Sequence, residues 1–225
     1  HDDQHGTAIV VLAALRNALK LVKKDMSKVK IIMSGAGAAG TAIARLLVLS
    51  GATNIIAFDI DGVISKNSSS DGAMRDWFIE HSNKDDFKGS IHEALSGADI
   101  FIGVSAPNVL KEADIASMAA GSIVFALANP DPEIDPVIAR KYAAVVATGR
   151  SDHPNQINNV LAFPGIFRGL LDANAHKITD KLLVAAAEAI ADCVSPSQLN
   201  TSFIVPSVFD PNVVTQVAAA VKKSV

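Results

Sequence analysis

The fold is decided by one stretch of the sequence, Val29-Lys30-Ile31-Ile32-Met33-Ser34-Gly35-Ala36-Gly37-Ala38-Ala39-Gly40. The apolar run from Val29 to Met33 is short, which is typical of a buried strand. The glycines after it are spaced as Gly-x-Gly-x-x-Gly, and the alanine- and leucine-rich segment 41–49 has the composition of a helix. The stretch therefore predicts a strand, a glycine turn and a helix in succession.

Strand and helix patterns alternate through the middle of the chain. Because strands separated by helices pair in parallel through crossover connections, the alternation predicts a parallel sheet. The polar segment 65–71 has no apolar period and is predicted to be a loop. Further strands are expected at 54–58, 99–104, 122–128 and 143–148, and helices at 91–95, 112–120 and 136–142.

The two ends of the chain carry only helical patterns. Residues 6–24 repeat apolar side chains at three- and four-residue steps, and further helices are expected at 164–173, at 179–194 and after Asp210-Pro211. The predicted fold class is therefore α/β, a doubly wound, mainly parallel sheet with helical additions at both ends. We expect a single domain made of a leading helix (1–25), a sheet core (26–160) and a helical C-terminal part (161–225).

Composition and charge exclude several classes of protein. Of the 225 residues, 49% are apolar. There are 20 Lys and Arg and 23 Asp and Glu, which gives a net charge of −3. The chain therefore lacks the excess of basic residues that is typical of a nucleic-acid-binding protein. The single cysteine, Cys193, cannot form an intramolecular disulfide, and the cytoplasm is the expected compartment. The apolar stretches 7–22 and 182–194 are interrupted by charged residues and are expected to be too short to span a membrane.

Each glycine of the turn has a predicted task. Gly35 permits the tight turn, Gly37 lets the backbone approach a pyrophosphate, and Gly40 lets the helix pack closely on the strand. Ala38 and Ala39 at the helix N-terminus would offer their amides to the phosphates. The motif predicts a dinucleotide site, and a purely structural glycine turn is the alternative.

Asp59 stands at the end of the next strand, about twenty residues after the glycine motif, where an acidic residue binds the adenosine ribose hydroxyls. Asp61, close behind it, would repel a 2′-phosphate, so NAD is favoured over NADP. Lys66 could fold back toward that phosphate and weaken the preference. The alternative is that both carboxylates only begin a solvated turn before Gly62.

Three polar segments leave a structural and a functional interpretation open. Residues 1–7, His-Asp-Asp-Gln-His-Gly-Thr, put two carboxylates ahead of a helix, where they could bind a divalent cation or cap the helix. Asn129-Pro130 follows a strand and is either a ligand site or an Asn-Pro turn. The loop 149–159 is dense in amides and is either a binding loop or a plain connector.

Taken together, three separated segments resemble the malic enzyme family, particularly its shorter bacterial form. They are His1 to Ala8 (HDDQHGTA), Phe125 to Pro130 (FALANP) and Asn155 to Gly165 (NQINNVLAFPG). The similarity extends over the whole chain, which resembles the NAD-binding, Rossmann-type domain of such an enzyme. Three motifs in the right order are more specific than the glycine motif alone.

The resemblance implies an oxidoreductase that converts L-malate to pyruvate and CO2 by oxidative decarboxylation, with NAD and a divalent Mg or Mn ion, as a homodimer when intact. It places Asp3 as a metal ligand, with Asp2 beside it as a catalytic residue. It places Asn129, Asn158 and Asn159 at the malate and nicotinamide site. We therefore expect the asparagines to border the same cleft as the glycine turn, with Asp3 at its margin.

In the family's pattern a tyrosine acid, a lysine base and a Glu-Asp metal pair precede the aspartate motif. The chain begins at His1, and we expect it to be part of a longer protein, with the upstream malate and metal domain absent. The isolated chain is therefore expected to be inactive. The alternatives are the Rossmann domain of another amino-acid- or hydroxy-acid-type dehydrogenase and a non-catalytic nucleotide-sensing module.

Overall fold

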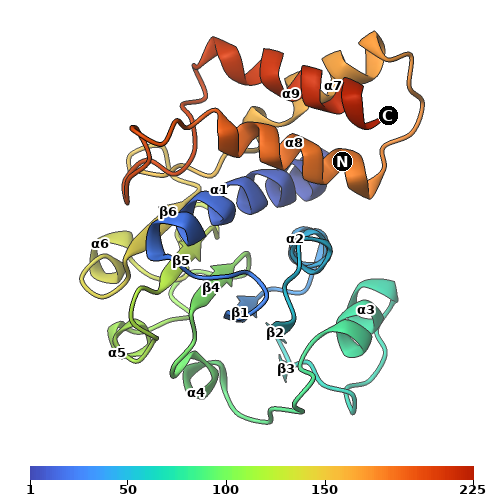
Figure 1. Cartoon of the computed structure of the whole chain (residues 1–225). Coiled ribbons are helices and arrows are strands. Elements are labelled where there is room, and N and C mark those ends of the chain that lie inside the picture. The colour runs from blue at the N-terminus through green and yellow to red at the C-terminus, as the bar shows by residue number, and fades with distance from the viewer.

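A computed structural model describes residues 1–225 and places a six-stranded sheet at the centre of the molecule (Figure 1). The strand order is β3-β2-β1-β4-β5-β6, and only β3 runs antiparallel to its neighbour. The predicted doubly wound, mainly parallel sheet is confirmed. The strands are β1 (Lys30–Ser34), β2 (Asn54–Asp59), β3 (Gly62–Val63), β4 (Ile100–Gly103), β5 (Ile123–Ala126) and β6 (Val145–Thr148).

Helices cover both faces of the sheet (Figure 1). On one face lie α1 (Thr7–Val22) and α2 (Ala38–Leu49), with α8 (Asp180–Asp192) packed on α1, and α7 (Phe163–Asp172) and α9 (Pro211–Ser224) farther from the sheet. On the other face lie α4 (Ile91–Leu95), α5 (Glu112–Ala116) and α6 (Pro136–Ala139). The π-helix η1 (Asp2–Gly6) leads into α1, α3 (Ala73–His81) lies at the β3 edge, and η2 (Asn159–Leu161) precedes α7.

Successive residues of the strands enter two separate cores. Ile31 and Met33 of β1 belong to a cluster of 45 buried residues that includes α1, α2, α7, α8 and α9. Ile32, between them, belongs to a cluster of 16 buried residues on the side of α4, α5 and α6. Side chains alternate across a strand, so a strand buried on both faces reads as a continuous apolar run. The helical ends of the chain make one core much larger than the other.

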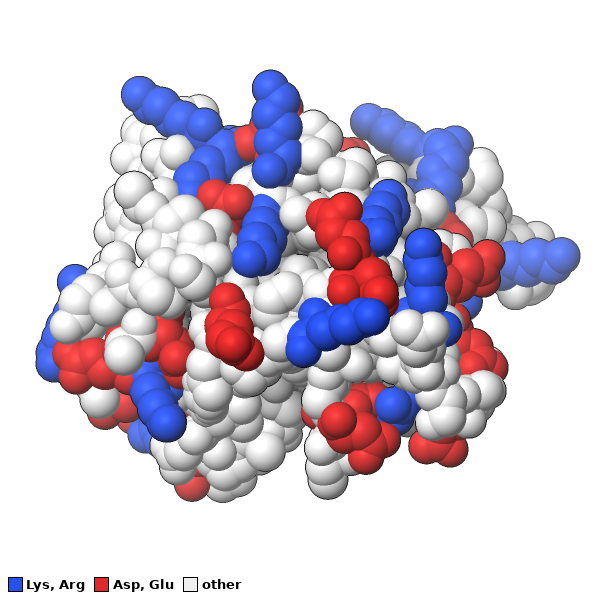
Figure 2. Space-filling model, turned by 90° about the horizontal axis from the view of Figure 1, so that it is seen from below, with Lys and Arg blue, Asp and Glu red and all other residues white.

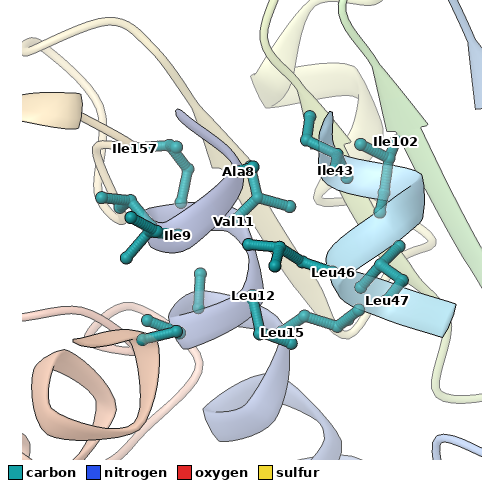
Figure 3. Close-up of a cluster of buried hydrophobic side chains, with 14 of the residues drawn as sticks. Ala8, Ile9, Val11, Leu12, Leu15, Ile43, Leu46, Leu47, Ile102 and Ile157 are labelled. Carbon is teal, nitrogen blue, oxygen red and sulfur yellow. The ribbon is translucent and has the colours of Figure 1, made fainter. Parts of the chain in front are cut away.

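The helix α1 is buried along most of its length. Every residue from Ala8 to Leu15 is at most 1% exposed, and Figure 3 shows Val11, Leu12 and Leu15 packed beside side chains of α2. The helical run Asp2–Val22 is long and apolar enough to cross a membrane, so the expectation that this stretch was too short and too charged was wrong. Of its most apolar 18-residue window, 67% is buried inside the molecule. Packing in the core therefore explains why this helix is so apolar.

The helix α3 and the short strand β3 were not predicted from the sequence. Only Phe78 of α3 is buried, so the segment has no wide apolar stripe that would reveal a helix. Within the helix, the Trp77 ring stacks on His81, with ring centroids 4.6 Å apart. The guanidinium of Arg45 in α2 lies 5.8 Å from the centre of the Trp77 ring. This missed helix carries Arg75, which is important for the site described below.

Charges of both signs are mixed on the surface. On the face shown in Figure 2, lysine and arginine side chains lie among aspartate and glutamate side chains. Opposite charges pair locally, as Arg150 does with Asp152 at 2.7 Å and Lys141 with Glu112 at 3.1 Å. Such exposed pairs contribute little to stability.

Candidate functional site

The glycine turn joins β1 to α2 at the point where the strand order reverses. Gly35 has a φ of 104°, a conformation that favours glycine, and a Cβ there would lie 2.7 Å from the carbonyl oxygen of Val104. A Cβ on Gly40 would overlap the carbonyl oxygen of Gly35. Packing alone therefore requires both of these glycines.

Gly37 differs from its neighbours in the motif. It is the N-cap of α2, and a Cβ built on it would meet no atom within 4 Å. Ala38 and Ala39 follow it in the first turn of α2, whose backbone amides have no partner within the helix. The turn thus leaves open space in front of a helix N-terminus, which fits the pyrophosphate of a dinucleotide.

A cleft of about 420 Å³ opens beyond the carboxyl ends of β4, β5 and β6. Its walls come from the N-terminus, the start of α2 and the loops after these strands. Ala39 is among the lining residues, whereas Gly37, Asp2 and Asp59 are not. Besides Ala39, the predicted site residues that line it are Asp3, Asn129, Asn158 and Asn159.

A hydrogen bond joins two segments of the site that are far apart in the sequence, the N-terminus and the loop after β6. The Nδ2 of Asn159 donates to Oδ2 of Asp2 over 2.8 Å, across 157 positions of the sequence. Gly6 permits this approach, because a Cβ there would lie 2.6 Å from Oδ1 of Asp2 and 3.0 Å from Cβ of Asn159. Neither aspartate side chain caps η1 or α1, so the alternative that they serve as helix caps is excluded.

Asp3 is the acidic residue of this pair that faces the cleft. Its side chain is 85% exposed, and its Oδ2 lies 3.8 Å from the Nδ1 of His1. No group of three His, Cys, Asp or Glu side chains gathers anywhere in the chain. The residues present therefore do not form a complete metal site, and Asp3 could supply at most one carboxylate ligand to a shared one.

The amide-rich loop divides into a structural part and a cleft part. Asn155 is buried with a φ of 58°, donates to the carbonyls of Val146 and Thr201, and accepts from the amide of Ile204. Asn158 accepts from the backbone amide of Val160 and so caps η2. Asn155 thus anchors the loop to β6 and to the C-terminal segment, and the following asparagines reach the cleft.

Asp59 has partners that the sequence did not predict. Its Oδ1 accepts from the amide of Asp61, and its Oδ2 lies 2.9 Å from Nη1 of Arg75. The same guanidinium lies 2.8 Å from Oδ2 of Asp61, and this hydrogen bond raises the pKa of Arg75. The end of β2 therefore holds two carboxylates and one cation. The cation is Arg75, whereas the sequence had pointed to Lys66, which is exposed and forms no ion pair.

This sheet order, with a glycine turn at the switch in strand order and a cleft at the carboxyl ends, defines a dinucleotide-binding domain of the Rossmann type. The family described as "Malic enzyme, NAD binding domain" matches residues 4–225. The chain therefore belongs to the malic enzyme family and is its NAD-binding domain.

Similar proteins agree with this assignment. The NAD-dependent malic enzyme of Geobacillus stearothermophilus is 51% identical over 98% of the chain, and an NADP-dependent malic enzyme of Escherichia coli is 40% identical over all of it. The crystal structure of the NAD-dependent malic enzyme of Thermotoga maritima covers the whole chain with a TM-score of 0.94 and 45% identity. The chain spans 46%, 32% and 59% of these three proteins, respectively.

Proposed function

We propose that the protein containing this domain oxidises L-malate and decarboxylates it to pyruvate and CO2, with NAD as the hydride acceptor. The observation that carries the proposal is the cleft that brings Asp3, Asn129, Asn158 and Asn159 together with the first turn of α2. Hydride transfer needs the nicotinamide and the substrate within about 3 to 3.5 Å of each other, and one cleft bordered by all these groups allows that.

The polar groups of the cleft suit a small dicarboxylate. Asn129, Asn158 and Asn159 each offer an amide N–H as donor and a carbonyl oxygen as acceptor, so they can orient substrate carboxylates and the nicotinamide amide. Asp2 is proposed as a catalytic residue whose carboxylate is oriented by Asn159. Asp3 is proposed to contribute one ligand to a Mg or Mn ion, which when bound would polarise the substrate oxygen as a Lewis acid.

The compartment and the assembly belong to the same proposal. A single, half-buried cysteine, Cys193, needs no oxidising compartment, and burial raises the pKa of its thiol to about 11, which makes it unreactive. These properties support a cytoplasmic protein. We also infer that the intact enzyme is a homodimer with L-malate and pyruvate as its small-molecule partners, a proposal that rests on membership of the family.

The adenosine end is proposed to prefer NAD over NADP. Asp59 and Asp61 together outweigh the charge of Arg75, so a 2′-phosphate would meet a net negative site. Calorimetry on the 225-residue chain should show tighter binding of NAD. Asp59→Ala should cost about 1 to 3 kcal/mol of NAD binding and shift the preference toward NADP, because Arg75 would then face the phosphate with one carboxylate fewer.

Asp76→Ala is the matched control for this measurement. Asp76 is exposed on the same helix as Arg75 and forms no ion pair, so its loss should leave the affinities for both cofactors unchanged. Equal affinities of the unmodified chain for NAD and NADP would contradict the proposed preference.

The test of the whole proposal is an assay of the full-length protein with L-malate, a divalent metal and each nicotinamide cofactor. Malate-dependent formation of NADH and CO2 is the expected result, and the 225-residue chain alone should form neither. The lining of its cleft contains no lysine, tyrosine or histidine that could act as acid or base. Oxidation of another hydroxy acid or amino acid would favour a different dehydrogenase, and binding without turnover would favour a nucleotide sensor.

A further inference from the structure

A fully buried carboxylate lies directly behind the wall of the cleft. Glu133 is 0% exposed and lies in the loop between β5 and α6. Its Oε1 accepts from the backbone amide of Ser105 at 2.8 Å and from the Ser105 hydroxyl at 3.2 Å. Its Oε2 accepts from the backbone amide of Ala128 at 3.1 Å. Both partner residues, Ser105 and Ala128, line the cleft.

The hydrogen bonds of Glu133 extend to three strand ends. The hydroxyl of Ser105 lies 2.7 Å from the hydroxyl of Ser34, the last residue of β1. Ser105 follows β4, and Ala128 follows β5 and precedes Asn129. One carboxylate therefore ties together the loops that leave β1, β4 and β5 at the edge where the ligand binds.

A glycine at the end of β4 leaves the space that the Glu133 side chain occupies. Gly103 ends β4, and a Cβ there would overlap the side chain of Glu133. Burial raises the pKa of Glu133, while the hydrogen bonds from Ser105 and Ala128 oppose that rise. A buried carboxylate is costly unless it is fully hydrogen-bonded, and an apolar side chain would fill the same space without that cost. Its position thus indicates a task other than filling the core.

We propose that Glu133 is a positioning residue that fixes the wall of the cleft against which the nicotinamide end of NAD lies. It acts through Ser105 and through Ala128, whose neighbour Asn129 is a proposed substrate group. The adenosine end, at Asp59 and Arg75, lies beyond β2 and is not touched by this network. This inference rests on the proposed function, because it takes the cleft to be the nicotinamide site.

The test compares the two ends of one bound ligand. In saturation-transfer NMR of the 225-residue chain with NAD, magnetisation passes from the protein to the nicotinamide and adenine protons, and their ratio reports how closely each ring is held. Glu133→Gln keeps the volume but places an N–H₂ group against one of the donors. The nicotinamide-to-adenine ratio should fall by about twofold or more, because a misplaced wall loosens only the nearby ring.

Asp114→Asn is the matched control for Glu133→Gln. Asp114 is also buried, accepts from the amide of Lys111 at 2.7 Å, and lines no part of the cleft. Its substitution should lower the melting temperature and leave the ratio unchanged. If Glu133→Gln fails to fold, Ser105→Ala removes the hydroxyl that joins Glu133 to Ser34 and should lower the ratio in the same direction.

The outcomes separate failure of this inference from failure of the proposed function. If the unmodified chain transfers magnetisation to adenine but not to nicotinamide, the cleft is not the nicotinamide site and the proposed placement is wrong. If the nicotinamide signal is present and neither Glu133→Gln nor Ser105→Ala lowers the ratio, Glu133 is not a positioning residue.

Discussion

Replacing Gly37 with alanine should weaken NAD binding by about ten- to a hundredfold while the chain stays folded. The added Cβ would occupy the open space in front of α2, where the pyrophosphate is proposed to lie. It would displace at least one hydrogen bond to a charged group, which contributes about 1.5 to 3 kcal/mol. Calorimetric titration with NAD measures the loss, and thermal unfolding measures the stability.

The stability of this variant should change little, for two opposing reasons. Gly37 has a φ of −78° and a ψ of −161°, which alanine adopts without strain, and alanine lowers the entropy of the unfolded chain. Alanine is also a poorer N-cap than glycine, which offsets that gain.

Gly40→Ala is the contrasting variant. Its Cβ would overlap the carbonyl oxygen of Gly35, so the turn must shift and the melting temperature should fall together with NAD binding. Unchanged NAD binding by the folded Gly37→Ala variant would show that the pyrophosphate lies elsewhere.

The parallel sheet could be predicted because its signals are local. The strands β1, β2, β4, β5 and β6 are each a short apolar run, and helices separate most of them along the chain. Burial on both faces of the sheet makes such runs continuous. The helix α2 begins at Ala38, inside the glycine motif, where the motif had placed the helix N-terminus, although the alanine- and leucine-rich composition begins only at residue 41. Glycine lowers helix propensity, and the packing of Gly40 on Gly35 overrides that preference here.

The parts of the site that were missed depend on contacts between distant segments. Arg75 belongs to a helix without an apolar stripe, and its role appears only when α3 brings it to Asp59 and Asp61. Glu133 stands in the same segment as Asn129-Pro130, where a charged residue would ordinarily be assigned to the surface. Its burial follows from the glycine at position 103, thirty positions earlier in the numbering, and no local pattern connects the two.

The site residues that were named in advance came from two sources. The glycines and Asp59 followed from the spacing of a motif with a physical mechanism. Asp2, Asp3, Asn129, Asn158 and Asn159 were assigned by resemblance, and their roles stay predictions. Their placement around one cleft, with Asn159 bonded to Asp2, makes those roles testable together.

Asp3→Ala in the full-length protein should reduce metal-dependent turnover of malate to below about 1% of the unmodified enzyme. Substitutions of residues that only support a metal ligand already cost about 10- to 100-fold, and loss of a ligand itself should cost more. The affinity for NAD should stay nearly unchanged, because the Asp3 side chain is 85% exposed and no hydrogen bond joins it to the glycine turn.

Asp180→Ala provides the control for Asp3→Ala, since Asp180 is an exposed carboxylate that lines a neighbouring cavity with His5 and not the cleft. It should leave both turnover and the dependence on metal concentration unchanged. The distinguishing measurement is turnover against metal concentration at saturating NAD, paired with calorimetry of NAD binding. A large loss of NAD affinity in Asp3→Ala with an intact response to metal would assign Asp3 to holding η1 against the cleft, because only a structural role would disturb the cofactor and spare the metal.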